Sequence, residues 1–379
     1  MLPPVIQMAC QWLRTGDEIF PAMLAAIDLA HSSVCLEVYI FAPSPLGERF
    51  REALVRAQQR GVRVRVLVDA LGSMELPSDF WQPLRAVGGE ARGFNPMGLM
   101  RFWFRDHRKL LVCDGRVAFV GGFNIAPEYE GDGVRSGWHD LGVRLEGPLA
   151  AQLASSFEGM FARADFRHKR FTRLRRFEMN RAVVWPPEQI LFSEPGRGRN
   201  PIKLAMRGDL AHARDVRIIS DYFLPAWGLR RDLARIVRSG GRVQLILAGK
   251  SDVWLSHLAA QSLYRRCMKD GVEIYEYQPQ ILHAKLILVD DVVYVGSSNL
   301  DQRSLRINYE LMIRFQNLEI ADEARGIFVE DLKRCQRITA KEWSRSRTLW
   351  QRLTMRAAFW LLMRVDPQLA RRQWRCMPD

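Results

Sequence analysis

The chain has 379 residues, of which 48% are hydrophobic and 26% are charged. This composition supports a sizeable core under a polar surface and excludes a disordered protein. The formal charge of +14 favours an anionic partner, either nucleic acid or an acidic membrane surface, and the alternative is a basic surface without a partner.

Cysteine usage and apolar runs narrow the class of protein further. The six cysteines are scattered and include no C-x-x-C pair, so we expect neither disulfides nor a zinc site, and a reducing compartment fits best. The segment from Met1 to Leu13 lacks a charged leader and a long apolar run, so we expect no signal peptide. No stretch approaches the roughly 18–20 apolar residues that span a bilayer. We therefore expect a protein that is soluble or lies on a membrane.

The first half of the chain alternates strand and helix patterns. Residues 34–41 read as a buried strand, residues 50–61 show helical spacing that ends at a glycine, and residues 62–68 are β-branched and apolar at alternate positions. A short segment, 89–96, opens on glycine and leads toward a strand that contains a His-x-Lys pattern.

The second half repeats this series. Residues 216–225 predict a strand, 229–240 a helix, 243–248 a strand, and 271–279 a segment that opens on glycine before a second His-x-Lys strand. Strands that alternate with helices indicate βαβ units around a mixed or parallel sheet. The sequence thus predicts a duplicated, two-lobed α/β protein, with a basic connection between the lobes around residues 163–176.

Two matching motifs lie 176 positions apart, and each has histidine, lysine two residues later and aspartate five residues beyond that. In a strand, residues two apart point to the same face, so each histidine projects beside its lysine. A glycine-containing turn follows each motif. The motif residues are His107, Lys109 and Asp114 in the first half and His283, Lys285 and Asp290 in the second; the turns are 121–124, which ends at Asn124, and 296–299, which contains Ser297 and ends at Asn299.

These motifs resemble the phospholipase D superfamily, whose signature is H-x-K-x4-D followed by G-[SG]-x-N. The resemblance spans residues 20 to 320 and is strongest to the short bacterial cardiolipin synthases that lack N-terminal transmembrane helices. It implies two pseudo-symmetric phospholipase D-like lobes, each a mixed β-sheet flanked by helices, with the active site between them. One departure is Gly122, which stands where many members have serine. We expect a first lobe at 1–160, a basic linker at 161–190, a second lobe at 191–335 and a basic amphipathic, membrane-associating segment at 336–379.

The chemistry of these residue types suits a phosphodiester. Lysines and asparagine amides neutralise nonbridging oxygens, and we expect Asn124, Asn299 and Ser297 to contact phosphate. One neutral imidazole attacks phosphorus while a second delivers a proton to the leaving oxygen. By resemblance, His107 is the nucleophile and His283 the general acid/base, although the sequence alone leaves the reverse open. No metal and no cofactor are expected.

Carboxylates complete the predicted site. Each histidine needs a partner on its other ring nitrogen, and the resemblance assigns this role to Asp140, which is 33 residues after His107, and to Glu310, which is 27 after His283. Asp114 and Asp290 end apolar strands, and we expect them to bond turn backbone. Glu37 and Asp221 are expected at matching positions of the two strand repeats, where they line the pocket floor or hold the lysines.

The nature of the phosphodiester rests on two further segments. Residues 345–375 place apolar and aromatic side chains at helical spacing beside arginines, which suits a membrane interface or, alternatively, a helix packed on the domain. Residues 97–104 form an aromatic and methionine cluster that admits acyl chains or belongs to the core.

We therefore expect a phosphatidyltransferase that converts two phosphatidylglycerols into cardiolipin and glycerol. Its partners would be anionic phospholipids rather than nucleic acid, and it would lie peripherally on the cytoplasmic face of the bacterial inner membrane. The alternatives are a phospholipase D-type hydrolase, a nuclease that uses the same histidines, and a membrane scaffold with an inactive site. The sequence leaves the oligomeric state open.

Overall fold

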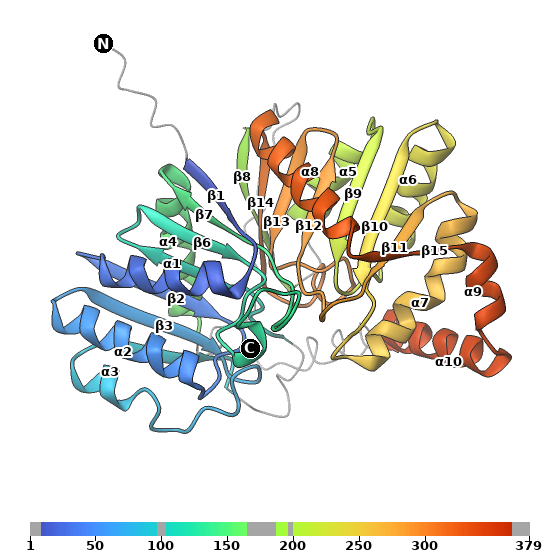
Figure 1. Ribbon diagram of the computed structural model, residues 1–379. Coiled ribbons are helices and arrows are strands. Elements are labelled where there is room, and N and C mark those ends of the chain that lie inside the picture. The colour runs from blue at the N-terminus through green and yellow to red at the C-terminus, as the bar shows by residue number, and fades with distance from the viewer. Residues whose placement is uncertain (1–8, 97–103, 165–186, 196–199, 366–379) are drawn as a thin grey trace, which may run out of the picture.

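Two lobes lie side by side in the computed structural model, which describes residues 9–96, 104–164, 187–195 and 200–365 (Figure 1). Each lobe contains one mixed β-sheet with helices against it, so the predicted fold is confirmed. The expected linker at 161–190 and the apolar cluster at 97–104 lie largely outside the described residues.

The first lobe holds a seven-stranded sheet in the order β1-β7-β6-β5-β2-β3-β4. Its parallel part is β2-β3-β4, and the other neighbours pair antiparallel. The strands are β1 (Ala9–Leu13), β2 (Ser33–Val38), β3 (Arg63–Asp69), β4 (Glu90–Phe94), β5 (Leu110–Cys113), β6 (Val117–Gly121) and β7 (Gly142–Glu146).

The second sheet repeats the first and adds one strand. Its order is β15-β11-β10-β9-β12-β13-β14-β8. From β11 to β8 this is the order of the first sheet from β4 to β1, with β9-β10-β11 as the parallel part. The strands are β8 (Glu188–Ser193), β9 (Asp215–Ser220), β10 (Arg242–Ala248), β11 (Glu273–Tyr277), β12 (Leu286–Val289), β13 (Val292–Gly296), β14 (Glu310–Gln316) and β15 (Cys335–Ile338).

Helices flank both sheets, and in α2 the N-terminal residues explain where the helix begins. Helix α2 begins at Pro45 rather than near residue 50, because Ser44 accepts a hydrogen bond from the N–H of Gly47 and proline suits the first helical position. The helices are α1 (Gly16–Asp28), α2 (Pro45–Gln59), α3 (Gln82–Ala86), η1 (Pro127–Tyr129), α4 (Pro148–Ala162), α5 (Pro201–Leu210), α6 (Trp227–Arg238), α7 (Trp254–Lys269), α8 (Leu318–Leu332), α9 (Ala340–Ser346), α10 (Leu349–Trp360) and η2 (Leu361–Val365).

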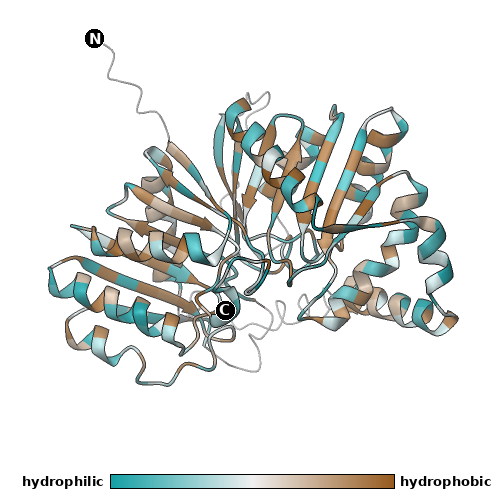
Figure 2. Ribbon diagram, in the orientation of Figure 1, coloured by the Kyte–Doolittle hydropathy of each residue, from teal (hydrophilic) through white to brown (hydrophobic). Residues whose placement is uncertain are grey.

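Three apolar clusters hold these layers together. One packs α1 and α2 on the first sheet, and a second packs α5, α6 and α7 on the second sheet. The third is shared by the lobes, because Phe157 of α4 belongs to the same cluster as Leu282 and Phe328 of the second half. The central strands are apolar on both faces (Figure 2), as expected for strands covered on two sides. The shared cluster fixes the two lobes as one body.

The C-terminal segment joins the second lobe and also exposes an apolar face. Strand β15 pairs with β11, so the second sheet continues past residue 335, where we expected the C-terminal segment to begin. In α10, Met355 and Ala358 are buried in the core of the second lobe. Leu349, Trp350 and Leu353 of the same helix are 75%, 77% and 54% exposed. No helix in the described parts of the chain is long and apolar enough to cross a membrane.

Asp114 and Asp290 lie in the tight turns that follow β5 and β12. Both adopt a left-handed backbone, with φ of 55° and 50°, which aspartate tolerates better than most residues. The Asp114 carboxylate accepts hydrogen bonds from the N–H groups of His31, Ser32 and Ser33. Asp290 accepts from the N–H groups of Arg214 and Asp215. Each motif aspartate therefore ties its turn to the start of the neighbouring strand.

Asp114→Asn should lower the free energy of unfolding by about 1 kcal/mol at neutral pH, because the carboxylate holds several backbone donors. Burial raises the pKa of Asp114, but the hydrogen bonds from Ser33, His31 and Ser32 outweigh it and lower the pKa to about 2. A depressed pKa gives stability that is present above the unfolded value and lost as the pH falls through the folded one. The difference from wild type in denaturant titrations should therefore shrink from pH 4 toward pH 2. The exposed control Asp79→Asn should show no such trend, and a pH-independent difference would contradict the role.

Candidate active site

The two His-x-Lys pairs lie where the lobes meet. We expected them inside strands, but His107 and Lys109 come just before β5, and His283 and Lys285 come just before β12. Both strands are central in their sheets and are buried along their whole length. Each strand thus anchors its motif from the C-terminal side, while the histidine and lysine extend beyond the ladder toward the other lobe.

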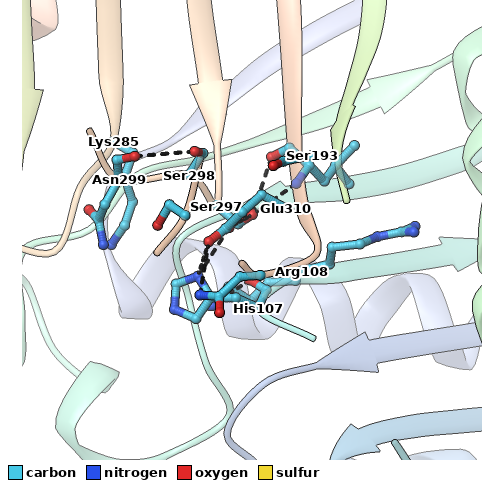
Figure 3. Close-up of polar contacts among 12 residues, drawn as sticks. His107, Arg108, Ser193, Lys285, Ser297, Ser298, Asn299 and Glu310 are labelled. Atoms are coloured by element: carbon cyan, nitrogen blue, oxygen red, sulfur yellow. Dashed lines mark hydrogen bonds and ion pairs between the residues drawn. The ribbon is translucent and has the colours of Figure 1, made fainter. Parts of the chain in front are cut away.

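Each histidine is bound to a carboxylate from the other half of the chain. His107 Nδ1 lies 3.1 Å from Glu310 Oε2, and Glu310 is the first residue of β14 (Figure 3). His283 Nδ1 lies 2.6 Å from Asp140 Oδ2, which comes from the first lobe. Both carboxylates are fully buried. The two residues that the resemblance assigned to this task are therefore in contact with histidines, but in a crossed arrangement.

Backbone contacts between the lobes set this crossed geometry. Asp106 and Tyr309 form a parallel bridge, directly before His107 and Glu310 in the chain. His139 and Leu282 form the equivalent bridge, directly before Asp140 and His283. The N–H of His107 donates to the Tyr309 carbonyl at 3.0 Å, and the N–H of His283 donates to the His139 carbonyl at 2.7 Å. Main-chain hydrogen bonds thus hold each imidazole against its partner.

The carboxylate contacts define how each imidazole can act. A carboxylate beside Nδ1 favours a proton on that nitrogen, which leaves Nε2 of a neutral ring free to attack or accept a proton. Burial lowers the pKa of His107, while Glu310 opposes the shift. Burial also lowers the pKa of His283, and the nearby Lys285 and Lys109 lower it further. Without a bound anion, both rings therefore favour the neutral form.

The motif lysines bring buried positive charge to the same place. Lys109 Nζ donates to the carbonyl oxygen of His107 at 2.8 Å, and Lys285 Nζ donates to that of His283. Burial lowers the pKa of Lys109 to about 7, against the opposing charge of Glu310. Burial also lowers the pKa of Lys285. Two desolvated ammonium groups in one site are suited to an anion that restores their charge.

The predicted phosphate contacts differ from one another. Asn299 is 3% exposed, and its side-chain oxygen has no hydrogen-bond partner among the described residues. Asn124 is bound on both sides, because its oxygen accepts from the N–H of Ile40 and its Nδ2 donates to the Tyr129 hydroxyl.

Ser297 contacts protein groups on both sides. Its hydroxyl donates to Glu310 Oε2 at 2.5 Å and accepts from the N–H of Leu311 at 3.0 Å, so it supports the carboxylate that holds His107. Its contact with a phosphate stays a prediction.

The structure gives a physical reason for glycine at position 122, which the sequence did not reveal. It precedes Asn124 as Ser297 precedes Asn299, and a Cβ at residue 122 would lie 2.1 Å from Asp140 Oδ1. The Asp140 carboxylate therefore occupies the space of a side chain at this position. In the second lobe, Glu310 is longer and accepts a serine hydroxyl there instead. The two halves thus support their carboxylates by different means.

Comparison with known proteins identifies the family of this chain. A family described as "Cardiolipin synthase, PLD-like domain" matches residues 23–161 and 207–332. The chain belongs to the cardiolipin synthase family of phospholipase D-like proteins. Cardiolipin synthase B of Salmonella typhi is 34% identical over 86% of this chain and 84% of its own length. Cardiolipin synthase B of Escherichia coli K12 is 31% identical over 96% of this chain and 91% of its own length.

The fold also matches a solved structure. Phosphatidylserine synthase of Haemophilus influenzae superposes with a TM-score of 0.74 at 15% sequence identity, over 95% of this chain and 94% of that one. At this identity the match shows only that this chain and that enzyme share a fold. The two-lobed architecture is therefore common to both.

Several site residues were missed by sequence reasoning. The buried Tyr129 places its hydroxyl 3.4 Å from His283 Nε2, and the Tyr39 ring packs edge-on against His107 with centroids 5.0 Å apart. His139 stacks on Tyr277 and binds Asp331 of α8 at 2.9 Å, across the lobes. None of these residues lies in a repeated motif. The only signals were that Tyr39 lies within the predicted strand 34–41 and that His139 directly precedes Asp140.

Glu37 also departs from expectation. It is fully buried, and its Oε2 lies 3.1 Å from Arg108 rather than beside a motif lysine. Burial raises the pKa of Glu37, and the charge of Arg108 opposes the rise. Glu37 thus neutralises the residue between His107 and Lys109. Among the described residues, no group of three or more His, Cys, Asp or Glu side chains is arranged to hold a metal ion.

The crossed pairing can be tested by ¹⁵N NMR of the imidazoles. Glu310→Gln should change the tautomer and the Nδ1 shift of His107 and leave His283 unchanged, because only His107 contacts Glu310. Asp140→Asn should do the reverse. Each substitution should also reduce turnover about 10²–10⁴-fold, as expected when a histidine loses its orienting carboxylate. If Glu310→Gln instead changed the ¹⁵N shifts of His283, which lies in the same half of the chain, the crossed geometry would be contradicted.

Proposed function

We propose that this chain is a cardiolipin synthase that transfers a phosphatidyl group from one phosphatidylglycerol to another and releases glycerol. The observation that carries the proposal is the closure of two His-Lys pairs into one site by crossed, buried carboxylates, in a chain of the cardiolipin synthase family. Two imidazoles in one site supply both the nucleophile and the proton donor that a double displacement requires.

The first step forms the covalent intermediate. Glu310 holds the proton of His107 on Nδ1, so the Nε2 lone pair attacks phosphorus. A phosphorus–nitrogen bond forms as the bond to the glycerol oxygen breaks. His283, protonated on Nε2, gives that proton to the departing oxygen. Glycerol leaves, and His283 is then neutral, with its Nδ1 proton shared with Asp140.

The second step reverses the proton transfer. Neutral His283 removes the proton from a hydroxyl of the second phosphatidylglycerol, and that oxygen attacks phosphorus. The phosphorus–nitrogen bond breaks, cardiolipin forms, and His107 regains its lone pair. The same residue acts as acid and then as base, so the enzyme returns to its starting protonation state. Water in place of the second lipid would give phosphatidic acid.

The electrostatics of the site favour binding of an anionic substrate. Burial raises the pKa of Asp140 to about 7, against the charge of Lys285, while that of His283 is lowered. The positive charges of Lys285 and Lys109 also disfavour a further positive charge on His283. An incoming phosphodiester anion offsets these lysines and thereby stabilises the imidazolium of His283 that the first step consumes. Binding of the substrate thus favours the protonated form of His283 that the first step needs.

We further propose that α10 places this site on an anionic membrane. Its exposed apolar side chains, with Trp360 at its end, lie on the surface beside several arginines, and such a surface binds at a bilayer interface. A groove between α7, α9 and α10 adds positive charge that lipid phosphates would offset. The groove is lined by Gln261, Ser262, Arg265, Trp343, Ser344, Arg347, Arg352, Met355 and Arg356.

The cytoplasmic face of the bacterial inner membrane is the location that we propose. The five cysteines that lie in the described residues are free thiols, and three of them are buried. Free thiols fit a reducing compartment. Association would be peripheral, through α10 and the arginine-lined groove.

Purified protein incubated with acyl-labelled phosphatidylglycerol vesicles should yield cardiolipin, with one glycerol released per cardiolipin formed. His107→Ala and His283→Ala should each abolish the product, whereas Asp79→Asn should match wild type. Separation of the lipids by chromatography gives the readout. Phosphatidic acid as the only product would identify a hydrolase instead. No lipid product, with cleavage of a plasmid by the same preparation, would favour the nuclease.

Trp350→Ser combined with Leu353→Ser should weaken flotation with phosphatidylglycerol vesicles at least about tenfold, because burial of each large apolar side chain is worth about 1.5–3 kcal/mol. Cardiolipin formation on vesicles should fall with the bound fraction. Leu318, which is 63% exposed at the start of α8, offers a matched control. Leu318→Ser should bind as wild type does, and equal loss in both variants would refute a specific role for α10.

A further inference from the structure

The strand registers show which residues of the two halves are equivalent. Glu37 of β2 pairs with Leu110, the residue after Lys109, and Ile219 of β9 pairs with Leu286, the residue after Lys285. Glu37 is therefore equivalent to Ile219, not to Asp221 as the sequence suggested. Counting two residues onward, Asp221 is equivalent to Tyr39.

A second pair of contacts gives the same alignment. Phe41 bridges to Ile125, directly after Asn124, and Phe223 bridges to Leu300, directly after Asn299. Phe41 and Phe223 are thus equivalent, and each lies two residues after Tyr39 or Asp221. The chain therefore carries a carboxylate at the position where its other half carries an aromatic ring.

Tyr39 shows what lies next to this position. Its ring contacts the His107 imidazole, and Lys109 Nζ lies 5.4 Å from the ring centroid. By the same symmetry, we place Asp221 on the side of the site that holds His283 and Lys285. The electrostatics agree, because burial raises the pKa of Asp221 and the charge of Lys285 opposes that rise.

Asp221 is buried, and its carboxyl group makes no well-formed hydrogen bond to the residues that the structure describes, although the effect of burial on its pKa is slightly opposed by the neighbouring Tyr222. Its residue is 5% exposed, and neither carboxylate oxygen has a hydrogen-bond partner among the described residues. The neighbouring Tyr222 hydroxyl donates to Asp252 at 2.7 Å. In contrast, the buried Asp69 accepts from the N–H groups of Leu71 and Asp106 and pairs with Arg105. A buried carboxyl group without a partner is destabilising, so its presence here points to a ligand.

We propose that Asp221 binds the polar headgroup that leaves or enters on the His283 side, by accepting hydrogen bonds from its O–H or N–H groups. The inference rests on the proposed function, because there His283 protonates the departing headgroup and later deprotonates the acceptor hydroxyl. A glycerol headgroup offers a further hydroxyl beside the reacting oxygen, and an ethanolamine headgroup offers an ammonium. Asp221 would select acceptors that carry such a donor.

This subsite makes the two ends of the reaction centre chemically different. The His107 end carries the aromatic Tyr39, and the His283 end carries the acidic Asp221. A polar headgroup is better accommodated at the second end, while the phosphatidyl group stays on His107. The two histidines otherwise have symmetric surroundings. The presence of Asp221 where the other half has Tyr39 therefore gives a reason why they take different roles.

Competition between small acceptors tests the inference. Acyl-labelled phosphatidylglycerol vesicles would be incubated with wild type, Asp221→Leu or Asp221→Asn in the presence of equal excesses of 1-propanol and either deuterated glycerol or ethanolamine. Mass spectrometry gives the ratio of each phosphatidyl product to phosphatidylpropanol. Propanol lacks the second donor, so its product measures transfer that does not depend on Asp221.

Wild type should prefer the donor-bearing acceptors, and Asp221→Leu should lower both ratios at least about tenfold, as expected when a site loses the group that hydrogen-bonds a substrate. Retention of the glycerol preference in Asp221→Asn with loss of the ethanolamine preference would show that a neutral acceptor suffices for a hydroxyl whereas the ammonium needs the negative charge, and loss of both would show that both donors need the carboxylate. The exposed Asp322→Asn, which removes one negative charge from α8, should change neither ratio.

Unchanged ratios in both Asp221 variants, with phosphatidylpropanol still formed, would overturn the inference and leave the proposed function standing. Failure of wild type to form any phosphatidyl product would instead count against the proposed function. Thermal unfolding adds an independent readout, because removal of an unpartnered buried carboxyl should leave stability equal or raise it. A marked loss of stability in Asp221→Asn would show a structural role and also overturn the inference.

Discussion

The imidazole of His107 and the carboxylate of Glu310 come from opposite halves of the chain, as do His283 and Asp140. Each half therefore lacks a complete catalytic pair by itself. The backbone bridges Asp106–Tyr309 and His139–Leu282 bring the pairs together, and the apolar cluster shared by the lobes holds those bridges in place. Because the pairs cross, any shift of one lobe against the other would disturb both histidines at once. The interface between the lobes is thus part of the active site.

Burial determines the electrostatics of this interface. Two lysines, two histidines and several carboxylates are taken from water into one region, and desolvation is the largest influence on the pKa of Lys109, Lys285 and Asp140. Such a site is unfavourable when empty, since a buried charge needs a partner. The apolar cores on either side offset that burden. An anionic phosphodiester would supply the missing charge, so that instability of the free site favours substrate binding.

The sequence allowed the duplication, the mixed sheets and the two His-Lys-Asp motifs to be predicted, because strand and helix periodicity and a doubled motif are local signals. The crossed pairing was not predictable, since chain order does not say which lobe a carboxylate faces. The role of Ser297 depended on the reach of Glu310 across a hairpin. Matching Glu37 to Asp221 failed because both are acidic, and Glu37 lies in β2 while Asp221 directly follows the equivalent β9. Only the hydrogen-bond register shows that they are two positions apart.

The central step of the proposed mechanism is a covalent intermediate at one histidine, in a site that both halves of the chain build. Rapid mixing of the full chain with phosphatidylglycerol labelled on phosphorus, an alkaline quench that preserves phosphorus–nitrogen bonds, and peptide mapping would locate it. We expect one phosphatidyl group per chain, attached to His107, in a single turnover of wild type. Label on His283 would reverse the assigned roles, and cardiolipin formation without any labelled histidine would contradict the mechanism.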